Sequence, residues 1–86
     1  MRLVYEKDFI KSARPLPMSI QKLLAEQLKR LQESPRDPRL HSKVLSGSLM
    51  NFLSFRITRD YRTIFQYIDR DTIQLLIVEH RKDIYR

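Results

Sequence analysis

The segment from Met18 to Glu33 constrains the fold most, because it carries the pattern of a long amphipathic helix. Its apolar side chains recur at the spacing of one helix face. They are Ile20, Leu23, Leu24, Leu28 and Leu31. Pro17 suits the first turn of this helix, and Ser34-Pro35 ends it. A helix with an apolar stripe buries that stripe against a second layer, so we expect a sheet beneath it.

Strand patterns supply that second layer. Leu49–Thr58 and Tyr61–Asp69 alternate in polarity, and Thr72–Glu79 is apolar on both faces, which places it inside a sheet. A short strand at Arg2–Glu6 and a short helix at Lys7–Arg14 precede the long helix. We therefore predict a single α+β domain over residues 1–86 with the order β-α-α-β-β-β. Its sheet is mainly antiparallel, with two helices on one face and the other face partly open.

Charge and composition narrow the classes of partner. The chain has 17 Lys and Arg against 10 Asp and Glu, a net charge of +7. A small domain this basic usually binds a polyanion or an acidic protein. It has no cysteine, which excludes disulfides and thiolate metal sites. No apolar run has the length of a membrane span or the pattern of a signal segment, so we expect a cytoplasmic protein with no membrane partner.

Metal and cofactor motifs are also missing from the sequence. No set of His, Asp and Glu has metal-ligand spacing. The chain has one glycine, Gly47, whereas a phosphate-binding glycine loop needs several. We therefore expect no metal and no cofactor. His41 lies in the polar connection Arg39–Ser48, where a lone histidine is usually solvated.

The turn between the two alternating strands decides which residues share a face. In a two-residue hairpin, Thr58 would pair with Tyr61, and Arg56 and Arg62 would lie on opposite faces. A three-residue loop, Arg59-Asp60-Tyr61, or a bulge would place both arginines on the open face. The apolar residues favour this longer turn, because it gathers them under the helices. We predict the longer turn.

The residues that follow the apolar strand form a dense group of cations and proton carriers. They are His80, Arg81, Lys82, Tyr85 and Arg86. This group is either a solvated basic tail or one wall of a site that the buried strand holds in place. In the second case the other wall is Arg56 and Arg62, which could equally be solvated strand positions.

The chemistry that fits such a face is the cleavage of RNA by its own 2′-hydroxyl. The substrate supplies the nucleophile, so the protein needs neither a metal nor an activated nucleophile of its own. Arg56 and Arg62 would neutralise the pentavalent phosphorane. His80 or Tyr85 would carry the protons.

The segments that contain these residues resemble a known family. Phe55-Arg56-Ile57, the run from Asp60 to Phe65 and the run from His80 to Arg86 are similar to the RelE branch of the RelE/ParE toxin superfamily. The resemblance covers the whole chain, and the C-terminal half is its specific part. It implies the fold predicted above. It also implies the toxin of a type II toxin–antitoxin pair, which cleaves mRNA in the ribosomal A site without a metal and is silenced by a cognate antitoxin in a hetero-oligomer.

The resemblance also implies roles for individual residues. Arg62 matches the arginine of the family's "YR" motif, Arg81 matches the arginine that ends the last strand, and Tyr85 matches the C-terminal tyrosine. These three residues and His80 are the candidate catalytic residues. Arg56 falls where RelE carries a lysine.

One departure from the family pattern concerns Ser54, which replaces a second lysine. We expect His80 or Lys82 to compensate for the missing amine, or the activity to be weak. The candidate substrate-binding residues are Arg56, Ser54, Lys82 and Arg86.

Two other functions share this fold. A ParE-like protein would inhibit DNA gyrase and cleave nothing itself. A basic module that has lost catalysis would only bind RNA or the ribosome. The ending from His80 to Arg86 favours the mRNA endonuclease, whereas Ser54 keeps the non-catalytic alternative open.

Overall fold

The protein is described from a computed structural model, which covers residues 1–45, 47 and 51–84. Its elements, in chain order, are β1 (Arg2–Tyr5), α1 (Lys7–Ala13), α2 (Met18–Glu33), the 3-10 helix η1 (Pro38–Leu40), β2 (Lys43–Val44), β3 (Leu53–Arg56), β4 (Tyr61–Asp69), β5 (Thr72–His80) and α3 (Arg81–Ile84). The strands form one sheet in the order β1-β5-β4-β3-β2, in which β1 runs parallel to β5 and the other pairs are antiparallel. The predicted α+β architecture and the β-α-α-β-β-β order are confirmed. The additions are η1, β2 and α3, which are too short to leave a periodic pattern in the sequence.

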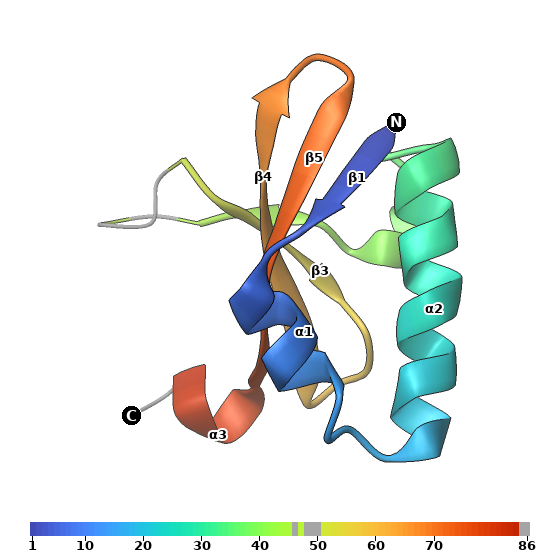
Figure 1. Cartoon of the computed structure of the whole chain (residues 1–86), viewed down its shortest axis with the longest axis vertical. Coiled ribbons are helices and arrows are strands. Elements are labelled where there is room, and N and C mark those ends of the chain that lie inside the picture. The colour runs from blue at the N-terminus through green and yellow to red at the C-terminus, as the bar shows by residue number, and fades with distance from the viewer. Residues whose placement is uncertain (46, 48–50, 85–86) are drawn as a thin grey trace.

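Helix α2 has the bounds that the prolines and the apolar stripe predict. In the view of Figure 1, α2 stands to the right of the sheet and α3 lies at the lower left. Helix α1 lies between these two helices in this view. Leu24 and Leu31 are buried against the sheet, whereas Leu23 of the predicted stripe is 39% exposed. The core contains Phe9, Leu24, Leu31, Leu40, Phe55, Ile57, Phe65, Ile73, Leu75 and Val78. Burial of this apolar surface is the main force that holds the two helices on one face.

The strand bounds follow the prediction closely in the second half of the chain. Strand β4 is as predicted, and β5 extends by one residue to His80, between β1 and β4 as expected of a strand that is apolar on both faces. Strand β3 is shorter than the predicted Leu49–Thr58. Residues 49 and 50 of that prediction lie outside the described residues.

The predicted register of the β3–β4 hairpin is confirmed. Arg56 pairs directly with Arg62, so their side chains share a face. A bulge achieves this register: the amides of Ile57 and Thr58 both donate to the carbonyl oxygen of Tyr61, at 2.9 and 3.2 Å. Tyr61 is therefore the first residue of β4 and not part of a three-residue loop.

A second bulge changes which residues of β5 face the helices. The pairing between β4 and β5 shifts between Ile64 and Phe65, so that Leu76 is the extra residue. Consequently Leu75 and Val78 both point into the core.

No helix in the described part of the chain is long and apolar enough to cross a membrane.

Candidate functional site

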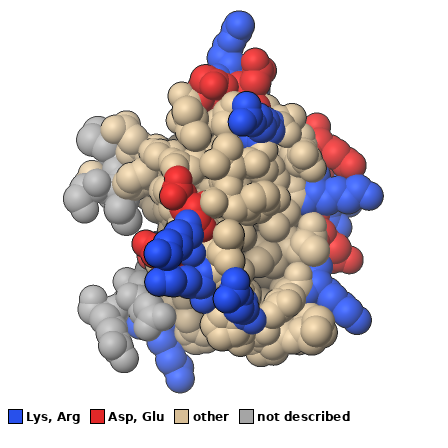
Figure 2. All heavy atoms as spheres, in the orientation of Figure 1, with Lys and Arg blue, Asp and Glu red and all other residues tan. Residues whose placement is uncertain are grey.

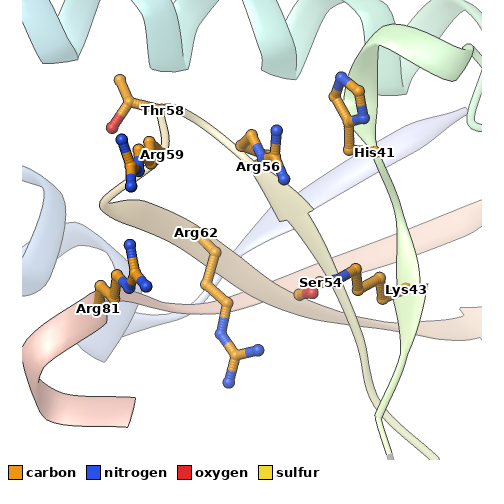
Figure 3. Close-up of a pocket in the computed structure, with 8 residues that line it drawn as sticks. All are labelled: His41, Lys43, Ser54, Arg56, Thr58, Arg59, Arg62 and Arg81. Atoms are coloured by element: carbon orange, nitrogen blue, oxygen red, sulfur yellow. The ribbon is translucent and has the colours of Figure 1, made fainter. Parts of the chain in front are cut away.

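A cleft of about 360 Å³ lies on the sheet face that α1 and α2 leave uncovered. The residues that line it are His41, Lys43, Ser54, Arg56, Thr58, Arg59, Arg62 and Arg81 (Figure 3). We call it the basic cleft, because Lys and Arg make up most of this set. Among the residues that the structure describes, its lining includes no Asp or Glu.

On the face shown in Figure 2, Lys and Arg side chains stand near acidic ones, whereas the described lining of the basic cleft includes no Asp or Glu. Several like charges around one cleft repel one another and create a strong positive potential inside it. An anionic ligand would relieve that repulsion, so the basic cleft is suited to phosphate groups.

The hairpin and the end of β5 bring the arginines together. The register places Arg56 beside Arg62, and the backbone amide of Arg81 donates to the carbonyl oxygen of Asp60 at 2.6 Å. This bond ties the start of α3 to the tip of the hairpin, where the amide of Asp60 also donates to Thr58 Oγ1 at 3.2 Å. Three of the predicted arginines, Arg56, Arg62 and Arg81, therefore line one cleft.

The guanidinium of Arg62 is only partly compensated by its surroundings. Its Nη2 lies 3.4 Å from Glu79 Oε2, and the two side chains are 25% and 30% exposed. Its Nε is buried and has no hydrogen-bond partner among the described residues. The Arg62 side chain is nevertheless part-exposed in the cleft, so its terminal N–H groups can donate to a further anionic acceptor.

Ser54 lies in the basic cleft as expected, and it is 4% exposed. Lys43 on β2 is its direct cross-strand partner, and Figure 3 shows the Lys43 side chain extending toward Ser54. Lys43 on the neighbouring strand thus supplies an amine beside Ser54, the position where the family pattern has a lysine. Lys43 could not be recognised from the sequence as a cleft residue, because a strand of two residues shows no alternation.

His41 is an exposed loop residue, as expected, and it also lines the basic cleft. It follows η1 and has the left-handed backbone angles φ 47° and ψ 46°. It is the one non-glycine residue with positive φ in the described part of the chain. Unusual backbone conformations of this kind concentrate at functional sites.

Gln27 of α2 holds the backbone on both sides of this part of the cleft. Its Nε2 donates to the carbonyl oxygens of Arg39 and Arg56, at 2.9 and 2.6 Å, and its Oε1 accepts from Arg30 at 2.8 Å. Gln27 is 5% exposed and sits within the apolar face of α2. The signal was visible in the sequence as a polar residue midway between Leu24 and Leu31.

Asp37 stabilises η1 from its N-terminal end. Its carboxylate accepts hydrogen bonds from the Arg39 side chain, at 3.0 and 2.7 Å, and from the Arg39 backbone amide, at 2.9 Å. The side-chain bond is the main cause that lowers the pKa of Asp37 from 3.8 to about 2, and the backbone bond adds to it. The same pair raises the pKa of the Arg39 guanidinium.

The structure places His80 outside the basic cleft, so the expected position beside Arg56 and Arg62 is wrong. Arg62 pairs with Glu79, and the next pair, Tyr61 and His80, therefore points to the opposite face. The His80 ring packs edge-on against Tyr61 with 4.7 Å between centroids. Its Nδ1 accepts a hydrogen bond from the backbone amide of Lys82 at 3.1 Å.

The other residues of the C-terminal group are not brought to the cleft by any described contact. Lys82 and His80 line a separate hollow of about 470 Å³ together with Asp60 and Arg81. Tyr85 and Arg86 lie outside the described residues. In the part of the chain that the structure covers, no three His, Asp or Glu side chains are grouped to hold a metal ion.

Comparison with solved structures identifies the fold. A YoeB/ParE toxin from Agrobacterium tumefaciens matches with a TM-score of 0.79 and 13% identity, over 93% of this chain and 98% of that chain. The toxin–antitoxin complex RelBE2 from Mycobacterium tuberculosis contains a chain that matches with a TM-score of 0.76 and 24% identity, over 93% of this chain and 96% of its own. A RelB–RelE antitoxin–toxin complex from Methanococcus jannaschii gives 0.77 and 28%, over 95% and 94%.

Comparison of the sequence alone gives the family. No curated protein sequence matches the chain. The family model for the ParE toxin of type II toxin–antitoxin systems matches residues 3–85. The resemblance to the RelE/ParE superfamily is therefore confirmed, and its members of known structure carry both the RelE and the ParE names. The chain belongs to the ParE toxin family of type II toxin–antitoxin systems, within the RelE/ParE superfamily.

Proposed function

We propose that this toxin is a ribosome-dependent mRNA endonuclease, which cleaves mRNA in the ribosomal A site by attack of the RNA's own 2′-hydroxyl. The observation that carries the proposal is the basic cleft, which Arg56, Arg62 and Arg81 line without an acidic lining residue among those described. Such a site can hold one phosphodiester and stabilise the charge that develops on it.

The chemistry requires two proton transfers and one displacement. The 2′-oxygen forms a bond to the adjacent phosphorus, and the bond from phosphorus to the 5′-oxygen breaks. The 2′-hydroxyl proton goes to a base, and a proton is supplied to the departing 5′-oxygen. The products are a 2′,3′-cyclic phosphate and a 5′-hydroxyl, so no water is consumed in this step.

The arginines have the charge-stabilising role. Their guanidinium groups remain protonated and donate hydrogen bonds to the oxygens of the phosphorane, whose charge exceeds that of the substrate. Arg62 is the strongest candidate, because it lines the cleft and its ion pair with Glu79 is long, at 3.4 Å, and part-exposed. Tyr85 remains a candidate proton donor from the family resemblance.

The partners follow from the same charge. Two of the similar structures are complexes of a toxin with its antitoxin, which supports a cognate antitoxin for this chain as well. We expect the antitoxin to bind this basic domain, whose net charge is +7, through an acidic or amphipathic segment. Ribosome binding should weaken with salt, because neutralised phosphates release counterions.

Translation in vitro, followed by primer extension on the message, tests the proposal. Codon-positioned cuts that are lost in Arg81→Ala and Tyr85→Phe proteins would support it. The matched control is Arg70→Ala, which removes an exposed arginine from the β4–β5 turn, away from the basic cleft.

The family model that matches is named for ParE, which favours a second candidate, inhibition of DNA gyrase. The same protein preparation distinguishes the two. An intact message together with gyrase-linked DNA breaks would support the second candidate and would exclude the first.

A further inference from the structure

The basic cleft contains several donors but few groups that can accept a proton. Arginine and charged lysine side chains have hydrogen-bond donors and no acceptor, whereas a neutral imidazole has one of each. Among the described lining residues, His41 is the only nitrogen side chain of the second kind. The hydroxyls of Ser54 and Thr58 are far weaker bases than an imidazole.

We propose that His41 is the general base of the basic cleft and accepts the 2′-hydroxyl proton of the bound RNA. This inference rests on the proposed endonuclease function. It assigns the proton transfer to a residue of the η1–β2 connection, in place of His80, which lies on the other face of the sheet.

The position of His41 fits an in-line displacement. Figure 3 shows His41 and Lys43 on the β2 side of the cleft and Arg59 and Arg81 on the α3 side, with Arg56 between them. The attacking and departing oxygens lie on opposite sides of phosphorus in this reaction. A base at one end of a row of cations can therefore reach the 2′-oxygen while the cations hold the phosphate.

The backbone on the N-terminal side of His41 is held in place by several contacts. Leu40, directly before it, is fully buried, and Gln27 binds the carbonyl oxygen of Arg39. The His41 amide donates to the carbonyl oxygen of Pro38 at 3.1 Å. A catalytic base needs such support, because proton transfer depends on position within a fraction of an ångström.

The groups that face His41 are cationic or neutral. Lys43 comes from β2, Arg56 comes from β3, and Arg59 and Arg81 lie across the cleft. These cations would stabilise the negative charge that forms on the 2′-oxygen as its proton leaves. The same set explains why the site needs a base of its own: no described carboxylate lines the cleft.

The left-handed backbone at His41 makes the test unusually clean. Asn and Gly adopt this conformation readily, so His41→Asn and His41→Gly should keep the fold. Neither substitute can serve as a base at neutral pH. The matched control is His80→Asn, which removes the other histidine of the chain.

The assay is cleavage of ribosome-bound mRNA by the full chain, with folding of each variant checked by circular dichroism. We expect His41→Asn to lower the cleavage rate on the order of 10²-fold or more, and His80→Asn to leave it unchanged. Added imidazole should restore part of the activity of His41→Gly, because it can occupy the vacated space. It should restore none to Arg62→Ala.

Cleavage by a folded His41→Asn protein at the wild-type rate would overturn the assignment. A message with a sulfur in place of the 5′-oxygen at the cut site refines the test, because a thiolate leaves without a proton. Full recovery of His41→Asn on that message would show that His41 acts as an acid, and it would also overturn the base role. If the wild-type protein cuts no message, the endonuclease proposal and this inference both fall, whereas an active His41→Asn protein removes this inference alone.

Discussion

Gln27 is the residue through which the fold should control the basic cleft, and Gln27→Leu is the change that tests this. Leu has a helix propensity and a volume similar to those of Gln. The substitution therefore mainly removes the hydrogen bonds to the carbonyl oxygens of Arg39 and Arg56. It also leaves the Arg30 guanidinium without the Gln27 acceptor.

The magnitude follows from these contacts. Two carbonyl groups that lose their donor in a part-buried place each cost about 1–2 kcal/mol, and the added apolar surface of Leu offsets about 1 kcal/mol. We expect a net loss of about 2 kcal/mol in the free energy of unfolding. For a chain of this size, that loss lowers the melting temperature by about 8–16 °C.

Urea denaturation measures the stability, and primer extension after translation in vitro measures the cleavage. The control is Gln21→Leu, because Gln21 Nε2 also donates to two carbonyl oxygens, those of Arg14 and Leu16, both at 2.9 Å. Gln21 is only half-buried and contacts no cleft residue, so water can replace its bonds. We expect a smaller loss of stability and normal cleavage for this variant.

The reasoning would be refuted if Gln27→Leu were as stable as the wild type, or if Gln21→Leu reduced cleavage equally at a temperature where both variants are folded. The first result would mean that the two bonds contribute nothing net. The second would mean that any loss of stability, and not the position of η1 and β3, limits activity.

Three further predictions concern charges. Arg62→Ala should reduce cleavage on the order of 10²-fold and change stability by less than about 1 kcal/mol, because the pair with Glu79 is part-exposed; a large shift in the urea midpoint would contradict this. Glu79→Gln should tighten ribosome binding and steepen its salt dependence, as measured by co-sedimentation, since it removes the carboxylate that lies 3.4 Å from Arg62; weaker binding would show instead that Glu79 is needed to position the guanidinium. Asp37→Asn should lower the melting temperature by the same amount at all pH values above about 4, and the difference should vanish as the pH falls through about 2, because the lowered pKa of Asp37 stabilises the fold only while the carboxylate is charged; a difference that persists below that pH would contradict the assignment.

Much of the fold could be predicted from local patterns. The bounds of α2 followed from prolines and a stripe of period 3.6, and the register of the hairpin followed from keeping Phe55 and Ile57 in the core. Each of these inferences used the burial of apolar side chains, which is the strongest signal that a single sequence carries.

The site was harder to predict, because bulges and short elements decide it. The bulge at Leu76 shifts the alternation of β5, whose apolar residues on both faces give no sign of where the shift occurs. For that reason the face of His80 could not be fixed. Lys43 lies on β2 and His41 directly follows η1. These elements have two and three residues, and their position depends on tertiary contacts such as the bonds of Gln27.

The most direct test of the central claim is the requirement for the 2′-hydroxyl of the message. A message with a single 2′-deoxynucleotide on the 5′ side of the mapped cut is loaded on ribosomes with the wild-type protein, and the RNA ends are analysed. Our account predicts that the unmodified message gives a 2′,3′-cyclic phosphate and a 5′-hydroxyl, and that the deoxy message remains intact at that position. Cleavage of the deoxy message at the same bond would contradict attack by the 2′-hydroxyl.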